Sequence, residues 1–203
     1  GLKEEAASKT KSMLKVLSPT KIMDTYLIPS LDIVGRKYEE GEIFLPQLIQ
    51  SAETVKKAFE VIKHHIVESN GETMNIGKGK IILATVRGDI HDIGKNIVKI
   101  LLENYGFEVI DLGKDVPEDE IVRRVKQDKV PLVGLSALMT TTATNMADTI
   151  KALQEEGLNC RVMVGGAVLN EEYAKSIGAD NYGKDAQESV KIAQKFFSSR
   201  VKQ

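Results

Sequence analysis

The chain has little of what several classes of protein require. A single cysteine, Cys160, occurs in 203 residues, which excludes internal disulfides and a cysteine-rich zinc site. The 28 basic and 29 acidic residues nearly cancel, so the basic excess of a nucleic-acid-binding protein is missing. No apolar run reaches the roughly 18 residues of a transmembrane helix, and no signal peptide is recognisable. These absences predict a cytoplasmic protein with neither a membrane nor a nucleic-acid partner.

The sequence divides into two parts with different hydrophobic periods. Residues 1–70 are predicted to be helical with short connections, which indicates an antiparallel four-helix bundle. Its second helix begins near Pro19, and Pro29 is expected to break or kink that helix. The polar, glycine-containing residues 71–80 are predicted to be a linker. Residues 81–203 form the second predicted domain.

In the second domain, apolar strand patterns alternate five times with helical patterns. The strands are KIILATV, FEVIDLG, PLVGLSAL, CRVMVGG and the short ADNYG. This alternation predicts an α/β fold with a doubly wound, five-stranded parallel sheet. Five strands favour the flavodoxin-like (Rossmann-like) order 2-1-3-4-5.

In such a sheet, ligands bind beyond the carboxyl ends of the strands, where strands 1 and 3 diverge to opposite sides. The loop after strand 1, RGDIHDIG, supplies Asp89 and His91. The loop after strand 3, SALMTTTAT, supplies serine and threonine hydroxyls, and the loop after strand 4 begins GGAV. The topology therefore predicts a site at this edge of the sheet.

His91 has the chemistry of a metal ligand if one ring nitrogen is held. A carboxylate such as Asp89 can fix one nitrogen as N–H and leave the other as a Lewis base. A zinc site would need further protein ligands, and the remaining histidines, His64 and His65, lie in the helical part. A metal would therefore arrive with most ligands supplied, as in a macrocycle. Taken alone, however, a D-x-H sequence is more often a local hydrogen-bonded turn.

Other ligands of such sheets have signatures that this sequence lacks. A dinucleotide site needs G-x-G-x-x-G after the first strand, and that loop does not contain it. A phospho-receiver needs clustered acidic residues at the end of strand 1, which are also missing.

The spacing Asp89-x-His91-x-x-Gly94, followed by Ser136-x-Leu138 and then by adjacent glycines, resembles the signature of cobalamin-binding domains. Those domains hold the cofactor "base-off, His-on". The segment GEIFLPQLIQSAETVKKAFEVI resembles the helical cap that precedes the domain in methionine synthase and in corrinoid proteins of methyltransferase systems. The resemblance covers nearly the whole chain.

This resemblance implies a role for each matching residue. His91 would be the lower axial ligand of cobalt, replacing dimethylbenzimidazole, and Asp89 would bond its other nitrogen. Thr142 stands where the family has a serine that completes this relay. The residues that would line the slot for the displaced nucleotide tail are Ser136, Gly165 and Gly166, with Gly94 beside them. Further cofactor contacts are expected at Asp92, Ile93, Leu138 and Thr140.

In the cap, the resemblance implies that Tyr38, Leu45 and Leu48 cover the upper face of cobalt. The alternative is that these side chains are ordinary bundle core. Leu48 lies on the apolar stripe of its helix, so the alternative is strongest there.

The implied function is carriage of a methyl group on cobalt, with the cofactor passing between methylcobalamin and cob(I)alamin. The expected partners are methyltransferase domains or subunits and a reductive activation partner that rescues cob(II)alamin. The chain would not be a complete catalyst alone. The first hypothesis is the cobalamin module of a homocysteine methyltransferase (methionine synthase), and the absence of an initial methionine favours a piece of a longer chain. The alternative is a free-standing corrinoid protein of an anaerobic methyltransferase or demethylase system. A mutase subunit and a cobalamin-sensing regulator are less favoured.

Overall fold

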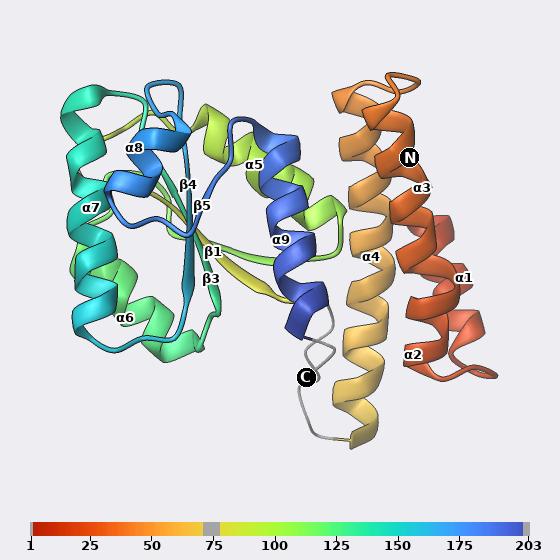
Figure 1. Ribbon diagram of the computed structural model, residues 1–203. Coiled ribbons are helices and arrows are strands. Elements are labelled where there is room, and N and C mark those ends of the chain that lie inside the picture. Colours follow the sequence, from red (N-terminus) through yellow and green to blue (C-terminus); the bar gives the residue numbers. More distant parts are fainter. Residues whose placement is uncertain (1, 71–77, 201–203) are drawn as a thin grey trace. The chain divides into compact units, whose positions relative to one another are not determined.

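The computed structural model describes residues 2–70 and 78–200 (Figure 1). Its contacts separate the chain into two compact units. The first contains Gly1–Lys78 and Glu103–Phe107, and the second contains Gly79–Leu102 and Glu108–Gln203. Of the predicted linker, residues 71–77 lie outside the described part of the chain.

The first unit is helical, as predicted. Its elements are α1 (Lys3–Met13), α2 (Pro19–Ile22), η1 (Met23–Leu27), α3 (Ile28–Glu39) and α4 (Leu45–Asn70). The Ser18 side chain accepts a hydrogen bond from Lys21 N and caps α2, with Pro19 at the first helical position. The core of this unit includes Ile22, Ile62 and Ile66, against which Leu14 and Leu17 pack.

Pro29 was expected to break or kink the second helix, and the break does not occur, because α2, η1 and α3 follow one another without interruption. Pro29 has no N–H to donate, and its ring would clash with the preceding turn of a regular α-helix. The five residues before α3 instead form a π-helix, in which Ile28 N–H donates to Met23 O. This wider turn accommodates the proline, so the second and third predicted helices are one continuous helical segment.

The second unit contains a parallel sheet in the order β2-β1-β3-β4-β5, which confirms the predicted flavodoxin-like topology. The strands are β1 (Lys80–Thr85), β2 (Glu108–Asp111), β3 (Leu132–Ser136), β4 (Arg161–Gly165) and β5 (Asn181–Tyr182). Every pairing between neighbouring strands is parallel. The carboxyl ends of β1 and β3 therefore lie side by side, as the site prediction requires.

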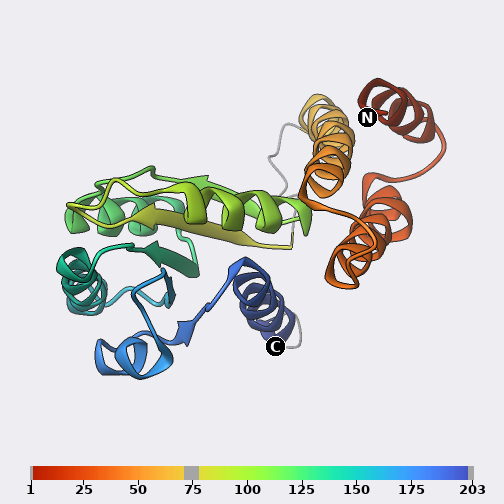
Figure 2. The same cartoon turned by 90° about the horizontal axis from the view of Figure 1, so that it is seen from above.

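Helices cover both faces of this sheet (Figure 1). They are α5 (Ile93–Asn104), α6 (Glu118–Asp128), α7 (Thr140–Glu155), α8 (Glu171–Ser176) and α9 (Ala186–Arg200). Figure 2 shows α7 and α8 on one side of the sheet and α9 on the other. Ile82, Val133 and Val162 face the α6–α8 layer and share a core with Ile121 and Met146. The opposite faces of the same strands lie under α5 and α9.

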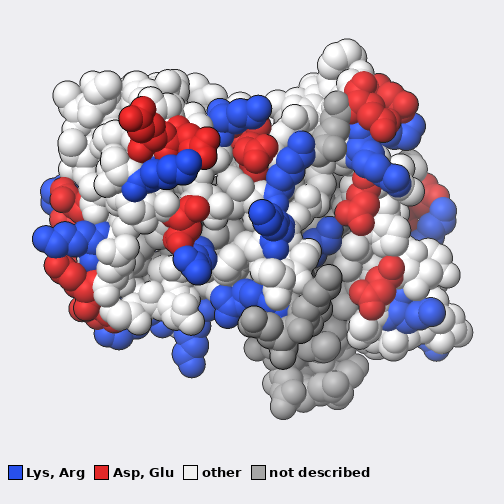
Figure 3. Space-filling view, in the orientation of Figure 1, with Lys and Arg blue, Asp and Glu red and all other residues white. Residues whose placement is uncertain are grey.

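The surface is mixed in charge. On the face in view, Lys and Arg are interspersed with Asp and Glu (Figure 3), as their near-equal totals imply. Within the described ranges, no helix combines the length and the apolar character needed to cross a bilayer.

Candidate functional site

Asp89 joins the two loops that were predicted to form the site. Its side chain is fully buried after the end of β1. Asp89 Oδ2 accepts hydrogen bonds from Leu138 N at 2.7 Å, Thr142 Oγ1 at 2.7 Å and Met139 N at 3.3 Å. Asp89 Oδ1 accepts one from His91 N at 2.9 Å. One carboxylate thus fixes the loop after β1 to the loop after β3.

These hydrogen bonds keep Asp89 ionised. Burial acts to raise the pKa of Asp89, but hydrogen bonds from Thr142 and from the backbone of His91 and Leu138 outweigh it. Donors that point at the charged form hold the pKa of this carboxyl far below its usual range. At neutral pH, Asp89 is therefore a buried anion that only accepts hydrogen bonds.

His91 presents one nitrogen to Asp89 and the other to the surface. Its Nδ1 lies 2.8 Å from Asp89 Oδ1, and 44% of its side chain is exposed. Because the carboxylate can only accept, the hydrogen resides on Nδ1 and the lone pair on Nε2. No hydrogen bond to Nε2 is formed by the described residues, so this nitrogen is available as a Lewis base.

Thr142, the residue predicted to complete the relay, lies within hydrogen-bond distance of Asp89. It is buried in the first turn of α7, and its hydroxyl reaches Asp89. Its γ-methyl lies 3.5 Å from where a Cβ at Gly88 would stand, so the methyl packs beside the loop without displacing it. The geometry therefore contains a continuous Thr142–Asp89–His91 series of hydrogen bonds.

The loop after β2 braces the same site, which the sequence analysis missed. Asp115 Oδ1 accepts a hydrogen bond from Gly88 N at 2.6 Å, and Asp115 N donates to Asp89 O at 2.9 Å. Asp115 adopts φ 54°, a conformation that aspartate tolerates better than most residues. An acidic residue in the loop after β2, the strand beside β1, was the available signal.

Beside His91 lies a cavity of about 590 Å³, within the size range of small-molecule sites. It lies on the face of β1, β3 and β4 that is turned away from α6–α8, called the cavity face below. It also reaches residues of α5 and of the segment from β5 to α9. The predicted cofactor residues that line it are His91, Asp92, Ile93, Gly94, Ser136, Leu138, Gly165 and Gly166. The fold therefore brings loops and strands that are far apart in the sequence together around one cavity.

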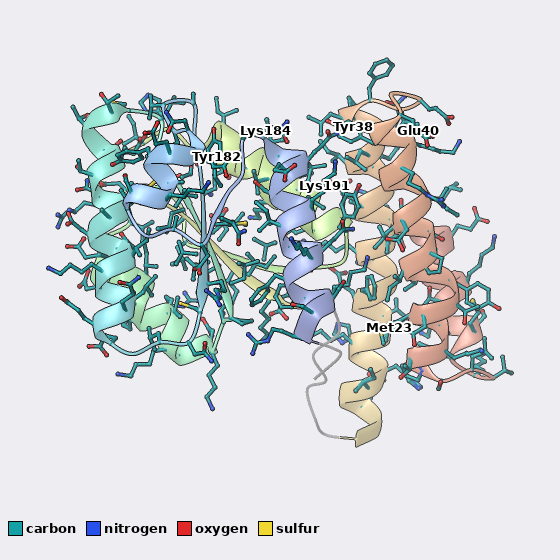
Figure 4. All side chains as sticks on the ribbon, viewed as in Figure 1. Met23, Tyr38, Glu40, Tyr182, Lys184 and Lys191 are labelled. Carbon is teal, nitrogen blue, oxygen red and sulfur yellow. The ribbon has the colours of Figure 1, made fainter. Side chains whose placement is uncertain are left out.

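Other predicted residues lie elsewhere. Asp89 and Thr142 are buried behind His91, and Thr140 is exposed at the start of α7, outside the described lining. In the helical unit, Tyr38 (labelled in Figure 4) and Leu45 are half-buried. Leu48 is only 1% exposed, as ordinary bundle core requires. A covering role for these three stays a prediction.

The protein has different requirements for glycine at positions 94 and 166. A Cβ on Gly94 would meet nothing within 4 Å, so the protein itself does not demand glycine there. A Cβ on Gly166, whose φ is +151°, would lie 1.8 Å from the backbone oxygen of Ala137. Gly166 lines the cavity, as expected of a residue of the predicted slot, and its missing Cβ also leaves room for the loop after β3. Gly94 is the position with open space beside the cavity.

The mouth of the cavity is apolar and exposed, which is unusual for a protein surface. Ile90 is 61% exposed, Ile93 78% and Leu138 42%. Ile90 was missed as a candidate, as were Gly183, Lys184 and Asp185 on the segment that leads into α9 (Figure 4). The signal for Gly183, Lys184 and Asp185 was their place after strand 5, and that for Ile90 was its place beside His91.

Comparison with known proteins identifies the family of this chain. The model of the B12 binding domain family matches residues 79–191, and a second B12 binding domain model matches residues 1–63. The chain belongs to the B12-binding corrinoid proteins. Its cofactor is accordingly cobalamin, and residues 79–191 contain the whole cavity and the Thr142–Asp89–His91 series.

Relatives and solved structures agree on the family. This corrinoid protein is 39% identical to dimethylamine corrinoid protein 1 of Methanosarcina acetivorans, over 90% of this chain and 85% of the relative. It is 38% identical to trimethylamine corrinoid protein 1 of the same organism, over 86% and 81%. The methanol:cobalamin methyltransferase complex MtaBC from Methanosarcina barkeri matches with a TM-score of 0.78 and 33% identity, over 89% of this chain and 68% of that one. These findings support the alternative of a corrinoid protein better than a methionine synthase module.

The residues of the corrinoid protein fit its cofactor. Nowhere in residues 2–70 and 78–200 do three His, Cys, Asp or Glu side chains gather closely enough to hold a metal ion. A single imidazole nitrogen is what a cobalt already bound in a corrin ring can accept from a protein. The apolar mouth suits the methyl groups at the edge of the ring, and the open space at Gly94 leaves room for an inserted group.

Proposed function

We propose that this protein carries a methyl group on the cobalt of bound cobalamin, receiving it from a methyltransferase subunit that acts on a methylated amine. A second methyltransferase then removes the methyl group, and a reductive partner restores oxidised cofactor. The observation that carries the proposal is the Nε2 of His91, held with its lone pair outward at the mouth of an apolar cavity. The relatives named for dimethylamine and trimethylamine support the choice of donor class.

Bound cobalamin supplies a cobalt centre that can take a methyl group from a donor and release it to an acceptor. His91 Nε2 would hold the cobalt, and Asp89 holds the Nδ1 hydrogen so that the lone pair stays on Nε2. Thr142 donates to Asp89 and keeps the carboxylate in place. The cavity along β1, β3 and β4 would hold the nucleotide tail of the cofactor.

The donor class is tested with purified subunits. Protein loaded with reduced cobalamin is mixed with a dimethylamine, trimethylamine or methanol methyltransferase and its substrate, and the absorbance of methylcobalamin is recorded. Methylation is expected with an amine methyltransferase and its amine. Methylation only with the methanol enzyme would overturn the choice of donor. A protein that no such enzyme methylates, although it binds cobalamin, would overturn the carrier role.

A shielding role for the helical unit is the second prediction of this proposal. If Tyr38, Leu45 and Leu48 cover the methyl face, light-generated methyl radicals recombine before they escape. Leu45→Ala is then expected to speed net photolysis of bound methylcobalamin several-fold, without changing cobalamin affinity. Leu45 is the better probe because Leu48→Ala removes a buried side chain and is expected to cost about 2–5 kcal/mol of stability.

The matched control is Ile33→Ala, which truncates an exposed apolar side chain of the same unit on α3. It is expected to leave the photolysis rate unchanged. Equal rates for the parent and Leu45→Ala would show that Leu45 belongs only to the core of the helical unit.

A further inference from the structure

Two rows of residues cross the cavity face of the sheet at successive depths. The upper row occupies the last position of each central strand and consists of Thr85, Ser136 and Gly165, which pair in register. The lower row lies two positions earlier along each strand and consists of Leu83, Gly134 and Met163, which also pair in register. Residues two apart on a strand face the same side. A flat group entering at the mouth therefore meets the upper row first and the lower row last.

The upper row is polar. Ser136 lines the cavity, and no described residue makes a hydrogen bond to its hydroxyl. Next to it in register, Thr85 is fully buried and its Oγ1 has no hydrogen-bond partner among the described residues. Thr85 does not itself line the cavity, so the hydroxyl that a ligand atom can meet at this level is that of Ser136.

The lower row is apolar and closely packed. A Cβ on Gly134 would lie 2.5 Å from Leu83 Cδ2 and 2.9 Å from Met163 Cε, so these two side chains close over the glycine. Leu83 and Met163 are both buried. The deep end of the cavity is therefore formed by a branched alkyl group and a thioether, neither of which is a good hydrogen-bond partner.

Two polar side chains that line the cavity, those of Lys95 and Ser189, are directed to partners in the protein. Lys95 lines the cavity with its stem, but its Nζ bonds Asp111 Oδ1, on the strand beyond β1, and Asn96 Oδ1. Ser189 Oγ donates to Asp185 O. A polar group inserted to the depth of Leu83 and Met163 would thus lose water without gaining an equivalent partner.

We propose that Leu83 and Met163 make this cavity selective for cobamides whose lower base has an apolar far edge, such as a dimethylbenzimidazole, over those with a purine base. The inference rests on the proposed function, since it requires the nucleotide tail to enter here. A purine would bury ring nitrogens or an amino group against the lower row. The expected ratio of dissociation constants is about 10- to 100-fold in favour of the benzimidazole, which corresponds to about 1.4 to 2.8 kcal/mol.

The test compares three probes by equilibrium binding to the full chain: cobalamin, the adenine-containing cobamide, and cobinamide, which has no nucleotide tail. Cobalamin is expected to bind most tightly, the adenine cobamide about 10- to 100-fold more weakly, and cobinamide more weakly than cobalamin. Equal affinities for cobalamin and the adenine cobamide, with weaker cobinamide, would overturn the selectivity alone. Equal affinities for cobalamin and cobinamide would show that the tail does not enter, and no binding of any probe would overturn the proposed function itself.

Two variants assign the selectivity to the lower row. Met163→Gln places an amide of similar length at the deep end and is expected to reduce the preference for cobalamin by at least several-fold. Met163→Leu keeps the apolar surface and is the matched control, which is expected to retain the parent's ratio. The ratio within one variant is independent of modest changes in stability. If the ratio of dissociation constants in Met163→Gln equals that of the parent, the lower row is not the origin of the selectivity.

Discussion

Asp89→Asn is expected to lower the free energy of unfolding by about 3 kcal/mol, because a buried carboxylate that accepts charge-assisted hydrogen bonds is replaced by an amide. One side of Asp89 faces the backbone N–H of His91 and the other faces that of Leu138. Whichever way the amide is placed, its NH₂ group meets an N–H donor. Denaturant unfolding of the cofactor-free parent and variant measures the loss.

The loss should depend on pH with a definite sign. The folded-state pKa of Asp89 lies below its ordinary value of 3.8. The stability that this carboxylate contributes is therefore fully present above about pH 4 and declines as the pH falls through the depressed folded-state value. The difference between parent and Asp89→Asn is expected to narrow below pH 4.

The control for this substitution is Asp92→Asn, in the same loop. Asp92 lies directly before α5, where asparagine and aspartate cap a helix about equally well. Its replacement is expected to change stability by less than about 0.5 kcal/mol. An Asp89→Asn protein as stable as Asp92→Asn would mean that the hydrogen bonds around Asp89 contribute little.

Gly166→Ala is expected to cost about 3 kcal/mol of stability, since it combines backbone strain with overlap against another loop. The added Cβ would lie 1.8 Å from the Ala137 backbone oxygen, and φ is +151°. Backbone atoms cannot rotate away as a side-chain end can. The loops after β3 and β4 must separate, so cobalamin affinity should fall together with the thermal midpoint.

Gly94→Ala is the matched glycine control. Nothing in the protein lies within 4 Å of its added Cβ, and an alanine within α5 favours the helix by up to about 1 kcal/mol. The variant is expected to be at least as stable as the parent, yet to bind cobalamin more weakly because its methyl intrudes on space beside the cavity. If Gly94→Ala binds cobalamin as tightly as the parent does, the nucleotide tail does not pass beside Gly94.

The strand order and the position of the site were predictable because both depend on short patterns. Alternating apolar strands and helices fix a parallel sheet, and a parallel sheet brings Asp89 and Ser136 to one edge. The direction of the His91 ring also followed from the chemistry of its neighbour. What the sequence predicted well therefore involves residues close together in the chain or joined by sheet register.

The parts that escaped prediction depend on contacts between loops. Asp115 meets Gly88 only because the segment after β2 folds back on the end of β1. The lining beyond β5 was missed because that strand has two residues and hardly any pattern. Gly166 was predicted to line the slot, but the Ala137 backbone beside it could not be foreseen from the sequence. Likewise, Pro29 could be seen to disturb the helix, but not that a π-helix would absorb it.

The most direct test of the account is whether His91 Nε2 is the lower ligand of cobalt. Protein labelled with ¹⁵N is loaded with unlabelled cob(II)alamin, and its electron paramagnetic resonance spectrum is recorded. A ligand nitrogen from the protein, with nuclear spin one-half, splits each cobalt line into a doublet. The dimethylbenzimidazole nitrogen, unlabelled and of spin one, gives a triplet. We predict a doublet in the parent that disappears in His91→Ala, whereas a triplet in the labelled parent would contradict the account.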